Sequence, residues 1–207
     1  MAMARIDRRR RTRLDPDARR SAIVEAARLL FAHDSYEKVA VTAVADQAGT
    51  SEALVYHYFD SKADLYVEVI GASMARLGRE QDAATDALPA SADARDRIRV
   101  RIEVLLDHLS GERDDPPEPF LLPGNDPSPA VVARRRMREE AASGLRSLLH
   151  LPEETAGRDD YALLGFLGFL DAACLAWVAR GCPDQDRRAL VETASDALFG
   201  ALRRRGT

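Results

Sequence analysis

The sequence predicts an all-α fold of about nine helices, arranged as a small N-terminal domain and a larger C-terminal one. Apolar residues recur at intervals of three and four along most of the 207 residues, as they do on one face of a helix. No segment shows the alternation that is typical of a β-strand. In addition, two short helical segments meet at Gly49, which predicts a compact helix–turn–helix unit.

Composition narrows the function classes. The formal net charge is -4, so the chain as a whole is not a general binder of polyanions. Arginines nevertheless crowd the first fourteen residues. The two cysteines, Cys174 and Cys182, show no metal-ligand spacing, and we expect a reduced, cytoplasmic setting without a disulfide scaffold. No apolar segment follows the basic N-terminus, so we expect no signal peptide.

The first helix is expected to begin at Asp15-Pro16, where an N-cap residue precedes a proline at the first helical position. It should end around residues 33–35. Its buried stripe is expected to consist of Ile23, Ala27, Leu30 and Phe31.

The helix–turn–helix is expected at about residues 40–59. Gly49 suits a left-handed turn, which costs a residue with a Cβ about 1 kcal/mol or more. Thr50 and Ser51 open the second short helix. Its inward-facing residues should be Leu54, Val55 and Phe59.

A longer helix should follow, because Ser61-x-x-Asp64 is a capping box. We expect Ser91 to cap the next helix. Residues 111–129 hold six prolines and predict a long loop, since proline removes a donor and restricts the residue before it. Ser128-Pro129 should then begin a helix that runs to about residue 150.

The segment Tyr161–Ala179 is almost wholly apolar and has to be tested as a membrane span. Asp171 near its centre would cost roughly 2.5–3.5 kcal/mol in lipid. We therefore expect no membrane association and a helix that is buried on more than one side. A final helix is expected with an apolar stripe at Leu190, Ala194, Ala197, Leu198, Ala201 and Leu202.

The run from Asp17 to Leu65 resembles the DNA-binding domain of the tetracycline-repressor family of bacterial regulators. The residues that carry this resemblance are Thr42, Ala45, Ala48, Gly49, Ser51 and the block Tyr56-x-Tyr58-Phe59-x-Ser61-Lys62-x-x-Leu65. They cover about a quarter of the chain. The resemblance implies a basic arm at residues 1–14, a helix–turn–helix domain at 15–64 and a ligand-binding and dimerisation domain at 65–207.

A helix that enters the major groove presents its N-terminal residues and one exposed face to base edges. Here that face should hold Glu52, Ala53, His57 and Tyr58. The resemblance implies that phosphates are held by Thr42, Tyr56 and Lys62, and Ser51 is a further residue expected to contact DNA. We also expect the arginine arm to touch the minor groove or the backbone.

The last two long helices are expected to form a homodimer interface, as the resemblance implies. Tyr161–Ala179 lacks a polar face, and Gly165 and Gly168 would allow a second backbone to approach closely. A two-fold dimer would place two recognition helices on successive faces of double-stranded DNA, so the operator should be nearly palindromic. The alternative is a buried central helix of a monomer.

The resemblance also implies a pocket for a small-molecule effector among the middle helices. Asp171 either pairs with an arginine such as Arg180 or meets a polar ligand or water. The candidate lining residues are His108, Phe120, Phe166, Phe169, Asp171 and Trp177.

Taken together, these features predict a ligand-responsive repressor, released from its operator by a small molecule and needing no cofactor or metal. An enzyme is disfavoured, because the four histidines are scattered and no nucleophile motif or phosphate-binding loop appears. A second alternative is a helical adaptor or sensor that binds a protein partner and has lost DNA recognition. Tyr56, Lys62 and the arginine arm argue against that alternative.

Overall fold

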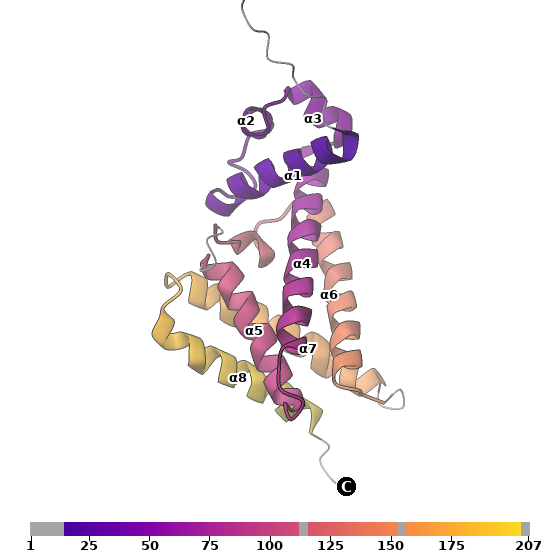
Figure 1. Cartoon of the computed structure of the whole chain (residues 1–207), viewed down its shortest axis with the longest axis vertical. Helices are drawn as coiled ribbons and strands as arrows, with labels where there is room; N and C mark the ends of the chain where they lie inside the picture. The colour runs from indigo at the N-terminus through magenta and orange to yellow at the C-terminus, as the bar shows by residue number, and fades with distance from the viewer. Residues whose placement is uncertain (1–14, 112–115, 153–155, 204–207) are drawn as a thin grey trace, which may run out of the picture.

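The computed structural model describes residues 15–111, 116–152 and 156–203. Within these ranges it is all helical, as predicted, with eight α-helices and one 3₁₀ helix, close to the nine helices expected. Figure 1 shows a small helical head at the N-terminal end above a larger helical body. The elements are α1 (Pro16–His33), α2 (Val41–Gln47), α3 (Glu52–Tyr58), α4 (Lys62–Asp86), α5 (Ala94–Ser110), η1 (Pro119–Leu121), α6 (Ser128–Leu148), α7 (Ala156–Val178) and α8 (Asp184–Leu202).

The head forms as its sequence predicts. α1 begins at Pro16, although the side chain of Asp15 makes no capping hydrogen bond. Gly49 adopts φ 61°, the left-handed conformation that a turn between α2 and α3 requires. The Ser51 hydroxyl accepts a hydrogen bond from the Leu54 amide and caps α3. These contacts fix the angle between the two short helices.

Two apolar cores lie one above the other. The head core gathers buried residues of α1, α2 and α3, including Ile23, Val44 and Val55. The body core is built from α4, α5, α7 and α8 and contains Trp177. α4 passes through both cores without interruption and connects head and body (Figure 1).

Two expectations about the middle of the chain need correction. The N-cap of α5 is Asp93 and not Ser91, because Asp93 and Asp96 form a reciprocal capping box. The proline-rich segment contains η1, and its residues Phe120, Leu121 and Leu122 are buried. The part of the segment that the structure describes is therefore packed into the junction between head and body.

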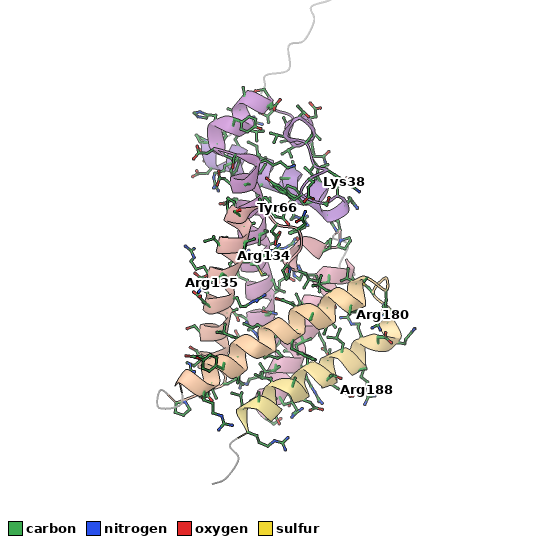
Figure 2. All side chains as sticks on the ribbon, turned by 180° about the vertical axis from the view of Figure 1, so that it is seen from behind. Lys38, Tyr66, Arg134, Arg135, Arg180 and Arg188 are labelled. Carbon is green, nitrogen blue, oxygen red and sulfur yellow. The ribbon has the colours of Figure 1, made fainter. Side chains whose placement is uncertain are left out.

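α7 and α8 lie side by side across the face of the body that Figure 2 shows in front. Gly157–Val178 is long and apolar enough to cross a membrane, with a mean hydropathy of 1.8. In the single chain 28% of its most apolar window is buried, so much of this helix faces outward. Its exposed apolar residues recur at helical spacing and form a stripe. The stripe consists of Tyr161, Leu164, Phe169 and Leu175.

Candidate nucleic-acid interface and effector cavity

α3 separates its inward and outward faces as predicted. Val55 and Phe59 are buried in the head core, and Leu54 is partly buried. Glu52, Ala53, Tyr56 and His57 are exposed, with 46% of the surface of Tyr56 accessible. Tyr58 is partly buried, and the His57 ring meets its edge at 5.5 Å. The outer face of α3 thus offers hydrogen-bonding groups to a partner.

The α3 anchor includes a residue that sequence inspection did not single out. The guanidinium of Arg20 on α1 lies 5.1 Å from the centre of the Phe59 ring. The same guanidinium donates a hydrogen bond to Glu68 on α4 at 2.6 Å. Arg20 thereby joins α1, α3 and α4. Its helical spacing from Ile23 and Ala27 places Arg20 beside the buried stripe of α1. The spacing does not identify its partners, because Phe59 and Glu68 lie far along the chain.

The other residues that are expected to contact DNA lie around α3. Thr42 is exposed in the first turn of α2, and Ser51 is exposed at the start of α3. Lys62 is partly buried: its ammonium lies 4.4 Å from the centre of the Tyr36 ring and donates to the Glu37 carbonyl at 3.4 Å. Burial lowers the pKa of Lys62, and nearby Glu37 acts in the opposite direction. The basic arm lies outside the described residues.

A cavity of about 570 Å³ lies in the body between α4, α5, α6 and α7. Its wall is mainly apolar and includes Met74, Leu77, Ile102, Leu121, Leu145 and Phe166. Gly78 lines the same cavity, and a Cβ added there would meet nothing within 4 Å. Such an enclosure suits a small molecule with a substantial apolar part.

Of the six residues predicted to line a pocket, Phe166 and Asp171 lie at this cavity. Phe120 instead lines a smaller cavity of about 330 Å³ at the head–body junction. His108 is buried in a cluster of charged side chains. Phe169 lies on the exposed stripe of α7, and Trp177 is buried and donates its indole hydrogen to the Pro183 carbonyl at 3.1 Å. The helical spacing of aromatic residues was therefore not sufficient to identify which of them line the 570 Å³ cavity.

Asp171 pairs with Arg138 on α6, and not with Arg180. Arg180 instead pairs with Asp186 at 3.0 Å. Burial raises the pKa of Asp171, and Arg138 offsets part of that rise. The pair places a partly neutralised polar group at one end of a mainly apolar space.

The arginine run on α6 points in several directions. Arg135 and Arg136 are solvent-exposed and pair with acidic residues one turn later, as expected for a surface face. Arg134 turns inward, donates to Asp126 at 2.7 Å and binds the carbonyls of η1. In Figure 2 Arg134 lies next to Tyr66, and the Tyr66 hydroxyl donates to Asp126 at 3.2 Å. Arg134 therefore holds the proline-rich segment against α6, and Asp126 connects the same segment to Tyr66 on α4.

Sequence comparison supports the reading of the head. Residues 23–69 match the model of bacterial regulatory proteins of the tetR family. The chain is 32% identical over 101 residues to the HTH-type transcriptional activator FasR of Mycolicibacterium smegmatis, which is 49% of this chain and 45% of FasR. It is 30% identical over 136 residues to the HTH-type transcriptional regulator BetI of Rhizobium meliloti, which is 63% of this chain and 66% of BetI. Each alignment thus spans less than two thirds of the relative.

Comparison with solved structures extends the likeness to the whole fold. The fatty acid degradation regulator FadR of Bacillus halodurans superposes with a TM-score of 0.69 at 20% identity, covering 93% of this chain and 99% of FadR. FadR of Bacillus subtilis, solved with stearoyl-CoA, gives a TM-score of 0.59 at 17% identity, covering 88% and 99%. Together, these comparisons show that residues 23–69 form a helix-turn-helix domain of the kind found in bacterial regulatory proteins of the tetR family, and that the described fold is similar to those of the two FadR structures.

Proposed function

We propose that the protein is a homodimeric repressor that binds a nearly palindromic operator through α3 and leaves it when a small molecule fills the body cavity. The observation that carries the proposal is the division of α3 into a buried anchor, Val55 and Phe59, and an exposed face of polar and small residues. An outer face of this kind can enter a major groove while the inner residues hold its angle.

Base contacts are assigned to the exposed residues of α3. The Ala53 methyl suits a thymine methyl, and Glu52 can accept a hydrogen bond from a cytosine amine. Glu52 also stands at the N-terminus of α3, where a carboxylate is favoured. The remaining base-reading residues are His57 and Tyr58. Phosphate contacts are assigned to Thr42, Ser51, Tyr56 and Lys62, whose groups bind without regard to sequence.

The apolar stripe on α7 supports the dimer. Removing apolar surface from water contributes about 25 cal/mol for each Å² buried, so an exposed stripe favours association. Gly165 is exposed on this face, and a Cβ there would meet nothing within 4 Å. A second copy related by a two-fold axis could therefore approach closely, with α7 and α8 of each copy forming four helices.

The proposed effector is a small molecule with a large apolar part, because the cavity wall is mainly apolar and its volume falls in the usual range for ligand pockets. Phe166 and Asp171 are the two residues from the sequence-based set that we assign to this site. The stearoyl-CoA complex of the B. subtilis FadR supports testing long-chain compounds. A ligand shifts the protein off DNA only if it binds the DNA-free conformation more tightly.

Selection of DNA fragments from a random pool by the purified protein tests the proposal. We expect one nearly palindromic sequence to be enriched, with affinity that falls steeply as salt rises. Tyr56→Ala and Lys62→Ala should weaken binding about equally across selected sequences, as loss of phosphate contacts does. Arg135→Ala removes an exposed charge from α6, below the head in Figure 2, and serves as the control. Absence of any enriched sequence would support the adaptor alternative.

The effector assignment is tested by thermal unfolding with stearic acid and stearoyl-CoA. A compound that binds the native state raises the melting temperature, and the stabilisation grows with the logarithm of its concentration above Kd. The same compound should release the selected DNA. A compound that stabilises the protein without releasing DNA would contradict the repressor mechanism.

A further inference from the structure

A buried carboxylate lies where the head meets the body. Glu118 is only 1% exposed, and four side chains converge on it. One carboxylate oxygen accepts from Arg76 at 2.6 Å, from Arg28 at 3.1 Å and from the Ser73 hydroxyl at 3.1 Å. The other oxygen lies 2.9 Å from Nδ1 of His108. We refer to Glu118 and these four partners as the junction cluster.

The junction cluster draws its members from four separate elements. Arg28 belongs to α1, whose residues Ile23 and Phe31 are part of the head core. Ser73 and Arg76 belong to α4, and His108 belongs to α5. Glu118 immediately precedes η1, and its amide donates to the His108 carbonyl at 2.8 Å. One carboxylate therefore connects the head to two helices of the body.

Charges in the junction cluster are closely balanced. Arg28 also donates to Glu25 at 2.9 and 2.7 Å, and Nε2 of His108 lies 3.2 Å from Glu80. Burial acts to raise the pKa of Glu118, but hydrogen bonds from His108 and Arg76 overcome it and lower the pKa to about 2. The hydrogen bond with Glu118 raises the pKa of His108 against the effect of burial. Such a cluster is costly to break, because removing one member leaves opposite charges buried without compensation.

The same segment also reaches the effector cavity. Phe120 packs in the head core, whereas the next two residues, Leu121 and Leu122, pack in the body core and line the cavity. On α4, the cavity residues Met74 and Leu77 alternate with the cluster residues Ser73 and Arg76. The Leu121 amide donates to the Glu118 carbonyl at 3.0 Å, so Leu121 connects the cavity wall directly to the junction cluster. Densely packed interiors transmit displacements.

We propose that residues 118–122 are the coupling element of this regulator. Occupation of the cavity moves Leu121 and Leu122, and the movement reaches α1 through the Glu118–Arg28 contact. The inference rests on the proposed function, because it takes the cavity as the effector site and the head as the DNA-binding unit. What it adds is the path, which runs through one buried contact between Glu118 and Arg28.

A substitution can stand in for the effector. Gly78→Phe fills the cavity from α4, and Gly78→Ala is its control, because alanine changes helix propensity without filling the space. Each is made in the wild-type chain, in Glu118→Gln and in Arg28→Gln. Asp126→Asn provides a matched background, since Asp126 is a buried carboxylate of the same proline-rich segment and its side chain bonds to Tyr66 on α4 and Arg134 on α6.

The affinity of the full-length protein for the selected DNA fragment is the readout. We expect Gly78→Phe to weaken binding at least tenfold in the wild-type and Asp126→Asn chains, and less than twofold in Glu118→Gln and Arg28→Gln. Gly78→Ala should stay within twofold everywhere. Hydrogen exchange of α1 amides should rise on Gly78→Phe only where Glu118 and Arg28 are both present.

Two results would overturn the inference. One is a tenfold effect that persists in both Glu118→Gln and Arg28→Gln; the other is no effect of Gly78→Phe in the wild-type chain. Arg28→Gln leaves Glu118 with three of its partners, so it decides the question if Glu118→Gln fails to fold. Failure of the wild-type chain to bind any selected DNA would instead overturn the proposed function.

Discussion

α3 and α7 are both exposed in the single chain, but their exposed faces have opposite chemistry. α3 shows a hydroxyl, an imidazole and a carboxylate, from Tyr56, His57 and Glu52. α7 shows the apolar stripe, in which 81% of Tyr161 is accessible. A polar face is stable in water and can bind and release a charged partner. An apolar face of this size is stable only when it is covered, which is why we assign α3 to a reversible partner and α7 to a permanent one.

Placing a charge on the α7 stripe should have the largest effect. Phe169→Asp would put a carboxylate into the proposed interface once from each copy, and burial of an unpaired charge is strongly unfavourable. We expect the dimer dissociation constant, measured by analytical ultracentrifugation, to rise at least a thousandfold, or about 4 kcal/mol. Val132→Asp makes the same change on the exposed surface of α6 and should leave the dimer unchanged. A dimer that survives Phe169→Asp would remove α7 from the interface.

Within α3, inner and outer aromatic residues should behave differently. Phe59→Ala removes a buried ring together with its contact to Arg20, and should lower the free energy of unfolding by about 3 kcal/mol. Tyr56→Ala removes an exposed ring and should change it by less than about 0.5 kcal/mol while weakening DNA binding. Urea denaturation followed by circular dichroism distinguishes the two. Equal destabilisation by both would mean that the α3 faces are assigned incorrectly.

Loss of the α3 cap should have a smaller effect. Ser51→Ala removes the hydroxyl that accepts from the Leu54 amide, which should cost about 1 kcal/mol. Ser51→Asn retains an acceptor and serves as the control. Faster amide exchange in α3, with α7 unchanged, would show that the loss is confined to the head. The prediction fails if α3 exchanges at the same rate in both variants.

The junction cluster should make the free energy of unfolding depend on pH. The pKa of His108 is raised in the folded protein, so its stabilising effect is full below about 6.5, the unfolded value, and disappears as pH rises through the folded pKa. The pKa of Glu118 is lowered to about 2, so its effect is full above its unfolded pKa and disappears as pH falls toward 2. Stability measured by denaturation should therefore decline on both sides of mildly acidic pH. His108→Gln should remove the decline on the alkaline side, and an unchanged profile would contradict the assignment.

Local sequence signals predicted local structure well. The proline at the start of α1 and the Ser61–Asp64 cap of α4 act within one turn, and both appear as expected. The two faces of α3 also follow from spacing, because burial of Val55 and Phe59 fixes where Tyr56 and His57 must point. Short-range patterns were therefore sufficient for most of the candidate DNA-binding face.

Partners distant in sequence could not be predicted in the same way. Asp171 was expected either to pair with an arginine such as Arg180 or to meet a polar ligand or water, but it pairs with Arg138 on the neighbouring helix. Glu118 lies among prolines in a segment predicted as a long loop, and only the packing of α1, α4 and α5 around it reveals its role. The prediction of the pocket residues was wrong for most of the set for the same reason, because the sequence does not indicate which neighbouring helix an aromatic side chain faces.

The unbroken course of α4 has a mechanical consequence. With 25 residues at about 1.5 Å each, the helix is roughly 37 Å long and behaves as a rigid rod. If it pivots at its body end, a tilt of about one degree moves its head end by about 0.6 Å, following from that length. In the proposed two-fold dimer both rods would tilt by the same amount, and the gap between the two copies of α3 would change by up to twice that displacement. A small rotation of α4 at the cavity would therefore be enlarged at the head.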